Sequence, residues 1–307
     1  MGRSGGPSRS RTPAATRSPC TIVPEPQLLV FGATGALGRH ALESLLARGI
    51  DPGTVTATGR NQTRLGELAV DGFNTARVDL SDPGAVAEAV AGHSEVALIS
   101  SDGPHRVEQH RAVIEAAKAA DVGHIYYTSG VRADDERFAI NADHRATEEA
   151  LVASGLTYTI MRNTWYIENY IPSLAAPRHT GVYAAAVGDA LVAPASRKDL
   201  GEALAVVVAT DGHDNATYSL SGATDVTYTD IAQAMSVVLG RGVEYRPVTA
   251  DELQEILTGI GMDEATAGFL AGLDETIGAG AFARVGDDLT RLIGRTTTGL
   301  VEGLTTA

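Results

Sequence analysis

A glycine-rich turn between an apolar strand and a helix constrains the fold of this chain more than any other feature. Residues 28–31 are four consecutive apolar residues, a pattern typical of a strand buried on both faces of a parallel sheet. Gly32, Gly35 and Gly38 follow at the spacing G-x-x-G-x-x-G, and apolar residues then recur at helical intervals as far as Gly49. A strand, a glycine turn and a helix in this order predict the first half of a dinucleotide-binding unit.

Each glycine has a physical role in such a unit. Gly32 allows the tight turn out of the strand, and Gly38 lets the helix pack closely on the sheet. Gly35 lets backbone N–H groups approach a pyrophosphate at the helix N-terminus, where the helix dipole favours negative charge. Glycines also serve ordinary turns, so the spacing is informative because a strand precedes it and a helix follows it.

Strands and helices alternate through the first half of the chain. Asp82 and Pro83, for example, form a typical helix start, with a capping side chain followed by a proline in the first turn. The alternation predicts an α/β protein with a doubly wound parallel sheet, the Rossmann fold. The predicted strands are 28–31, 54–58, 75–80, 95–101, 124–129 and 157–162, and the predicted helices include 64–70, 105–120 and 142–153.

Beyond Asn163 the alternation loosens. We predict helices at 199–210, 229–239 and 251–260 and a strand at 217–220, while the stretch 263–286 is rich in Gly and Ala and is expected to be the most mobile ordered part. We interpret this region as a smaller α+β substrate lobe that covers the carboxyl ends of the strands. The predicted organisation is a disordered extension at 1–26, the Rossmann domain at 27–165 and the lobe at 166–307, with 199–221 returning to the Rossmann domain.

Composition narrows the choice of partner. The formal charge of −14 predicts repulsion of nucleic acid and anionic lipid. No stretch has the ~18 apolar residues of a membrane span or the apolar core of a secretory signal. The single cysteine, Cys20, lies in the N-terminal extension, and no cluster has metal-ligand spacing. We therefore predict a cytoplasmic protein without a metal or a membrane anchor, which acts on a small molecule; a homodimer is compatible with the sequence.

The residues after the second predicted strand indicate which nicotinamide cofactor binds. NAD-binding units place a carboxylate there for the ribose 2′-OH, whereas an arginine suits a 2′-phosphate. This chain has Arg60, with Arg64 one helical turn later, and no carboxylate. The pattern favours NADPH over NADH. Asp79, at the end of the third strand, has two interpretations that stay open: contact with adenine, or an ordinary strand end.

The glycine turn and strand order resemble the extended and atypical short-chain dehydrogenases. Their usual catalyst is a serine with a Tyr-x-x-x-Lys pair, in which the tyrosine delivers a proton and the lysine lowers its pKa. Ser129, at the end of the fifth predicted strand, matches the serine. The pair is absent, because four residues before the two lysines, Lys118 and Lys198, stand Ile114 and Pro194.

This departure, together with several motifs, resembles the atypical NmrA-like family, and within it the flavin-free bacterial NAD(P)H:quinone oxidoreductases of type two. The most specific motif is Arg-Asn-x-Trp-Tyr-x-Glu-Asn-Tyr at 162–170. Two departures are Glu149, where those enzymes have lysine, and the pair Gly130 and Val131, where they are more apolar. The other matching segments are 32–38, 98–101, 109–120, 127–129, 142–144 with 147–148, and 292–298.

The resemblance implies where the site residues lie. Arg60 would bind the 2′-phosphate, the segment 163–166 would border the nicotinamide and the acceptor, and His144 would stand where related reductases carry a catalytic lysine. Together with the residue-level reasoning it yields three sets of candidates. They are Gly32, Ala33, Thr34, Gly35, Ala36, Leu37, Arg60, Asp79, Ser100, Ser101 and Thr128 for the cofactor; Ser129, His144 and Asn163 for catalysis; and Asn163, Trp165 and Tyr166 for the substrate.

The predicted function is a flavin-free, NADPH-dependent reductase that transfers a hydride to a quinone or a similar electrophile. Such an acceptor tolerates the missing Tyr–Lys pair, because proximity and orientation supply most of the catalysis. Two other classes stay open: a non-catalytic dinucleotide-binding redox sensor, and a biosynthetic reductase or epimerase. Individual residues also have structural alternatives: His144 as a helix-face residue, Trp165 and Tyr166 as core aromatics, and Asn163 as a turn cap.

Overall fold

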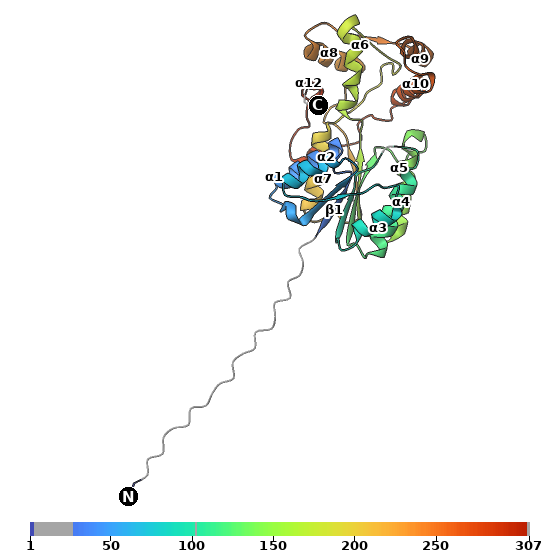
Figure 1. The fold of residues 1–307 in the computed structure, drawn as a ribbon. Helices are drawn as coiled ribbons and strands as arrows, with labels where there is room; N and C mark the ends of the chain where they lie inside the picture. The colour runs from blue at the N-terminus through green and yellow to red at the C-terminus, as the bar shows by residue number, and fades with distance from the viewer. Residues whose placement is uncertain (3–26, 102, 306–307) are drawn as a thin grey trace.

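A seven-stranded parallel sheet in the order β3-β2-β1-β4-β5-β6-β8 forms the larger part of the molecule (Figure 1). The structure, a computed structural model, describes residues 1–2, 27–101 and 103–305, so residues 3–26 of the predicted extension, with Cys20, lie outside it. The strands of this sheet are β1 (Leu28–Phe31), β2 (Val55–Gly59), β3 (Asn74–Arg77), β4 (Glu95–Leu98), β5 (His124–Gly130), β6 (Tyr158–Asn163) and β8 (Ala216–Leu220).

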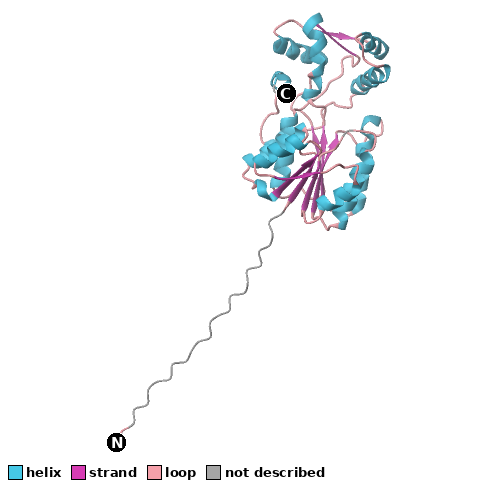
Figure 2. Cartoon of the chain, in the orientation of Figure 1, coloured by secondary structure: helices cyan, strands magenta, loops and turns pink. Residues whose placement is uncertain are grey.

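Helices cover both faces of this sheet, as Figure 2 shows. One face carries α1 (Ala36–Ala47), α2 (Gln62–Val70) and α7 (Arg197–Ala209), and the other carries α3 (Pro83–Val90), α4 (Arg106–Ala119) and α5 (Ala142–Ser154). Each layer encloses its own apolar core, because β1 and β4 are buried on both sides. The predicted fold class, a doubly wound α/β sheet with a smaller lobe, is confirmed.

Local sequence signals explain how several of these helices begin and pack. The side chain of Asp82 accepts hydrogen bonds from the N–H groups of Gly84 and Ala85, with Pro83 in the first turn of α3. Helix α7 lies against α1 at Gly201, where an added Cβ would be 2.8 Å from the backbone nitrogen of Ala41. A glycine is therefore required at this helix crossing.

The smaller part of the molecule lies beyond the carboxyl ends of the large sheet (Figure 1). A parallel pair of strands, β7 (Val182–Ala185) and β9 (Glu244–Pro247), packs with helices around a third apolar core that is rich in tyrosine. These helices are α6 (Ala175–Thr180), α8 (Tyr228–Leu239), α9 (Ala250–Gly259), α10 (Glu264–Gly278) and α12 (Leu300–Thr305), while α11 (Asp288–Ile293) packs on α7 and β8.

Two features of this part were not predicted from the sequence. The Gly- and Ala-rich stretch 263–286, for which no helix was predicted, contains the long helix α10, whose N-terminus is capped by Asp263 through the N–H of Thr266. Strands β7 and β9 were missed because each has only four residues, too few for a clear periodic pattern. No helix among the described residues is long and apolar enough to span a membrane.

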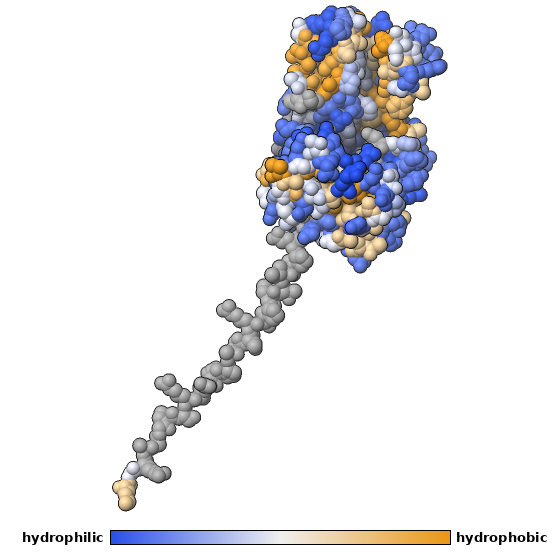
Figure 3. Space-filling model, in the orientation of Figure 1, coloured by the Kyte–Doolittle hydropathy of each residue, from blue (hydrophilic) through white to orange (hydrophobic). Residues whose placement is uncertain are grey.

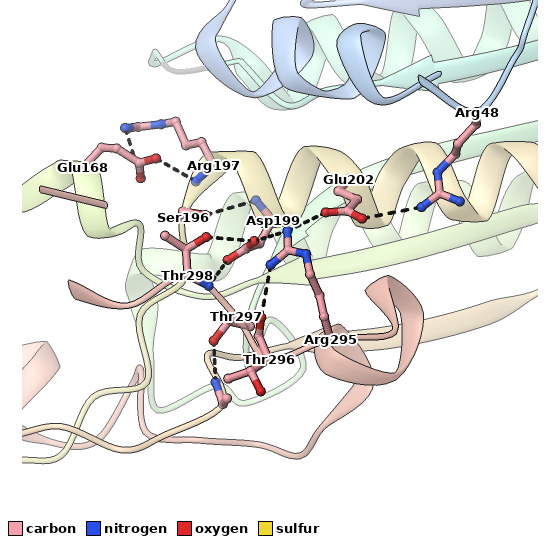
Figure 4. A network of polar contacts seen from close by, with 11 residues as sticks. Arg48, Glu168, Ser196, Arg197, Asp199, Glu202, Arg295, Thr296, Thr297 and Thr298 are labelled. Carbon is pink, nitrogen blue, oxygen red and sulfur yellow. Dashed lines mark hydrogen bonds and ion pairs between the residues drawn. The ribbon is translucent and has the colours of Figure 1, made fainter. Parts of the chain in front are cut away.

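A buried carboxylate ties the C-terminal segment to α7, the helix that returns to the large sheet (Figure 4). Asp199 is fully buried and accepts hydrogen bonds from Arg295 Nη2 at 2.7 Å and from the Thr298 N–H at 2.7 Å. Arg295 also pairs with Glu202, which in turn faces Arg48 at the end of α1. The segment 292–298, one of the family-like motifs, therefore holds the fold together around α7.

Candidate active site

A cavity of about 1140 Å³ lies between the carboxyl ends of the large sheet and the smaller part. Parallel sheets of this type bind ligands at that edge, where the strand order reverses between β1 and β4. Figure 3 shows a recess through the smaller part with apolar side chains along its walls. One end of the cavity is formed by the glycine turn, and the other by aromatic and aliphatic side chains.

The glycine turn is shaped for the close approach of a ligand backbone or phosphate. Gly32 has φ +80°, and a Cβ on Gly38 would lie 2.4 Å from the Gly32 oxygen, so both positions require glycine. Gly35 precedes the first residue of α1 and leaves the helix N-terminus open. Gly59, which the sequence analysis missed, is required because its Cβ would meet Thr34 Oγ1 at 2.2 Å.

Most of the predicted cofactor residues line the cavity, and two do not. Ala33 and Thr128 are buried behind the wall. Thr128 Oγ1 accepts a hydrogen bond from the Ser100 N–H at 2.8 Å, so it fixes the end of β4 rather than lining the cavity. The predicted residues on the wall are Gly32, Thr34, Gly35, Ala36, Leu37, Arg60, Asp79, Ser100 and Ser101.

The two arginines after β2 have different positions. Arg60 lines the cavity. Arg64 instead donates from Nη1 to the Thr34 carbonyl at 2.6 Å and so supports the turn from behind. Asp79 lines the cavity and accepts hydrogen bonds from the N–H and hydroxyl of Ser81, which lower the pKa of its carboxyl and keep it ionised. Such a carboxylate can only accept hydrogen bonds.

Ser129 lines the cavity, but its proton points away from it. Its hydroxyl donates to Glu148 Oε1 at 2.5 Å, and both residues are buried. Arg162 holds this carboxylate with two further hydrogen bonds, of 3.0 and 2.7 Å, and pairs with Asp134 on its other side. The carboxylate is therefore charge-compensated, and Ser129 offers an acceptor rather than a donor to a bound molecule.

His144 lines the cavity one helical turn before Glu148. Its Nδ1 lies 2.8 Å from Tyr127 Oη, and burial, followed by the nearby charge of Arg106, lowers the pKa of the imidazole to about 3. Gly130 makes room for the ring, since a Cβ there would lie 3.1 Å from His144 Cδ2 and 2.4 Å from Asn141 Oδ1. The departure from the family pattern at Gly130 thus has a steric reason.

The segment after β6 forms the boundary between the two ends of the cavity. Asn163, Trp165 and Tyr166 all line it, and the Tyr166 ring lies 4.6 Å below the guanidinium of Arg197. Asn163 is buried, and its Oδ1 has no hydrogen-bond partner among the described residues. An orphaned buried amide atom on a cavity wall fits a site that is completed by a ligand. Trp165 is only partly buried, so it serves both the core and the wall.

The apolar end of the cavity was missed from the sequence. Helix α10 contributes Phe269, Leu270 and Leu273, and Phe282 packs 5.2 Å from Trp165 between ring centroids. The spacing of the α10 residues places them on one helix face, which could have been read as amphipathic had the glycines not obscured it. Further wall residues that were missed include Arg106, Gln109, Ile140, Glu168, Asn169, Pro172 and Arg197.

Comparison with known proteins agrees with this geometry. A family model described as NAD(P)H-binding matches residues 32–211, which contain the glycine turn and most of the sheet. Quinone oxidoreductase 2 of Escherichia coli (strain K12) is 35% identical over 278 residues, or 90% of this chain and 97% of that protein. The chain belongs to the NAD(P)H-binding, NmrA-like family. The predicted family is therefore confirmed.

Two solved structures of the family superpose over nearly the whole chain. The NADPH complex of the Escherichia coli NADPH-dependent quinone oxidoreductase QOR2 is 35% identical, with a TM-score of 0.86, and covers 91% of this chain and 99% of its own. The Citrobacter sp. triphenylmethane reductase complexed with NADP(H) is 30% identical, with a TM-score of 0.85, and covers 92% and 99%. Family membership and these complexes support NADPH, the predicted cofactor.

The residues present fit a bound dinucleotide. Gly38 lets α1 pack tightly on the turn, since a Cβ there would clash with the Gly32 oxygen, and the open helix N-terminus suits a pyrophosphate. Arg60 is on the wall at the end of β2, where a 2′-phosphate would need a cation. Within the described ranges, no group of three His, Cys, Asp or Glu side chains could hold a metal ion.

Proposed function

We propose that the protein is a flavin-free, NADPH-dependent reductase that transfers a hydride to a planar, electrophilic small molecule of the quinone type. The observation that carries this proposal is one cavity with two unlike ends. The polar end has the glycine turn and Arg60, and the apolar end has Trp165, Phe269 and Phe282. A flat, apolar acceptor fits between aromatic side chains, and the two family members compared above act, by name, on a quinone and on triphenylmethane dyes.

In this reaction the side chains mainly have to orient the acceptor and exclude water. NADPH, when bound, supplies the hydride. Asn163, Trp165 and Tyr166 orient the acceptor, while α10 excludes water from the reacting atoms. A strong hydride acceptor needs no positioned Tyr–Lys acid, which this chain lacks. An unactivated ketone would need that acid, so we propose that ketones are poor substrates.

The decisive experiment is NADPH oxidation by the purified protein with a panel of quinones, dyes, enones and simple ketones. We expect turnover with quinones or dyes, no flavin absorbance, and slower turnover with C4-deuterated NADPH where hydride transfer limits the rate. Tight NADPH binding without oxidation by any acceptor would contradict the proposal and favour the redox-sensor alternative. Turnover restricted to ketones or enones would favour a biosynthetic reductase.

A further inference from the structure

A chain of polar side chains, joined by hydrogen bonds and one ring contact, leads from the cavity into the protein between β5, α4 and α5. It begins at His144, whose Nδ1 lies 2.8 Å from Tyr127 Oη. The His110 ring packs edge-on against Tyr127 with 5.5 Å between centroids, and His110 Nδ1 lies 3.1 Å from Thr147 Oγ1. Tyr127, His110 and Thr147 have no exposed surface. Each donor among them must therefore find its acceptor within the protein.

The hydrogen bonds at the inner end of this chain show which atoms of His110 and Thr147 carry protons. The Ser101 N–H donates to His110 Nε2 at 3.3 Å, so Nε2 is the acceptor and the proton of the neutral His110 ring is on Nδ1. That Nδ1–H donates to Thr147 Oγ1. The hydroxyl of Thr147 in turn donates to the Asp143 carbonyl at 2.9 Å. The single proton of Thr147 is thus already used.

The same count of donors and acceptors gives the direction of the hydrogen bond between Tyr127 and His144. Tyr127 Oη lies 2.8 Å from His144 Nδ1 and also interacts with the Thr147 hydroxyl. A reversed bond, from Nδ1–H to Oη, would leave the buried phenolic proton only Thr147 Oγ1, which already accepts from His110 Nδ1 and donates to the Asp143 carbonyl. Tyr127 therefore donates, and the His144 proton is on Nε2. Nε2 has no partner in the described part of the chain, and the ring borders Gly130 on the cavity wall.

We propose that Tyr127 is a positioning residue that holds His144 in its Nε2–H tautomer, so that the ring presents a neutral hydrogen-bond donor to the oxygen of the hydride acceptor. This inference rests on the proposed reductase function. The low pKa of His144 agrees with a neutral ring, since burial is its largest cause and Arg106 and His110 act in the same direction. Asp143 and Glu148 also lie nearby, but they pair with Arg106 and Arg162.

In this mechanism the proton that completes the reduction comes from water, and His144 acts as a hydrogen-bond donor. Hydride addition to a quinone leaves negative charge on one oxygen, and a preorganised N–H stabilises such a charge as it develops. The hydroquinone anion then takes one proton from water. The overall reaction consumes NADPH, the quinone and one solvent proton, and it yields NADP⁺ and the hydroquinone. His144 keeps its own proton, because losing it would leave an imidazolate.

Nitrogen NMR of ¹⁵N-histidine-labelled protein tests the tautomer without any acceptor. With the His144 signal identified by its absence in His144→Phe, we expect a protonated Nε2 and a bare Nδ1, unchanged down to about pH 5. Tyr127→Phe removes the donor to Nδ1 and should raise the His144 pKa. The matched control is Tyr126→Phe, whose hydroxyl interacts with Glu95 away from the cavity; it should leave the His144 spectrum unchanged. A wild-type spectrum with Nδ1–H would overturn the proposal.

Kinetics test what the tautomer does. His144→Phe removes the donor and should lower kcat by about 10²-fold, whereas His144→Gln keeps a neutral N–H and should lose only about tenfold or less. Tyr127→Phe should lower kcat by about tenfold with little change in the KM for NADPH. Equal losses in the Gln and Phe variants would contradict a donor role for His144. If no acceptor is reduced at all, the proposed function fails, while the NMR result still decides the tautomer.

Discussion

At the residue scale, Arg60 and Arg64 are two arginines close in sequence that have different contacts. Arg64 is engaged with the Thr34 carbonyl, whereas Arg60 lines the cavity. We expect Arg60→Asp to remove a charge-assisted contact of about 1.5–3 kcal/mol and so weaken NADPH binding by roughly 10- to 100-fold. NADH affinity should change little, and fluorescence titration with both cofactors measures this. An Arg60→Asp protein that still prefers NADPH would contradict the assignment.

Ser129 was predicted as catalytic, and its hydrogen bond to Glu148 limits which role it can have. Because the hydroxyl proton is donated to a buried carboxylate, Ser129→Ala should lower kcat by about tenfold or less, not by the ~10²–10⁴-fold typical of losing a general acid. Steady-state kinetics with one quinone measure the effect. A loss beyond about 10²-fold with normal NADPH affinity would show that Ser129 acts as a donor after all.

At the element scale, α10 lines the apolar end of the cavity, which we propose binds the acceptor, although the composition of this stretch suggested mobility. Phe269 is 65% exposed and yet lines the cavity, so it lies at the rim. We expect Phe269→Ala to raise the KM for aromatic acceptors by about 3- to 10-fold, since an aromatic contact contributes about 0.5–1.5 kcal/mol, with little change in kcat.

The control for Phe269 is Ile260→Ala. Ile260 is 68% exposed, follows α9 and does not line the cavity. Both variants should leave the free energy of unfolding within about 0.5 kcal/mol, as expected for exposed positions. An equal change of KM in the two variants would mean that α10 does not contact the acceptor.

At the scale of the whole molecule, the network around Asp199 joins the C-terminal segment to α7 (Figure 4). Removing one partner of a buried ion pair leaves the other uncompensated, so Asp199→Ala should cost about 3–5 kcal/mol of the free energy of unfolding. Glu202→Ala, which breaks a more exposed pair with the same Arg295, should cost about 1 kcal/mol or less. Urea denaturation compares them, and equal costs would refute the dominant role of Asp199.

His110 and His144 make the stability of the molecule depend on pH. The pKa of His110 is lowered to about 4 and that of His144 to about 3, both chiefly by burial. Below the unfolded pKa of about 6.5, the unfolded chain binds more protons, so stability falls as the pH falls. Between about pH 7 and pH 5 each histidine should cost about 2 kcal/mol.

The carboxyl group of Asp274 opposes this effect. Burial raises the pKa of Asp274 to about 6, so its native form gains stability as the pH falls. From His110, His144 and Asp274 together we expect a loss of about 2–3 kcal/mol between about pH 7 and pH 5, and a smaller loss in His144→Gln. Urea denaturation at both pH values measures it. A protein equally stable at both would contradict the neutral, buried histidines.

The amino-acid sequence by itself determined the fold class, the glycine turn and the dinucleotide unit. These follow from local causes: four apolar residues make a buried strand, glycines permit a tight turn, and the next residues repeat at helical spacing. The helix at Asp82 and Pro83 was predictable for the same reason, since its cap lies within a few residues of the groups it satisfies.

Only the tertiary structure decided what the site residues can do. Sequence placed Ser129 and His144 near the cofactor, but the direction of their protons depends on Glu148 and Tyr127, which approach from neighbouring elements. Likewise, the apolar wall on α10 and the buried contacts of Asp199 join segments distant along the chain. Hydrogen-bond direction and cavity walls are set by such long-range contacts, and the periodicity of a single segment does not contain them.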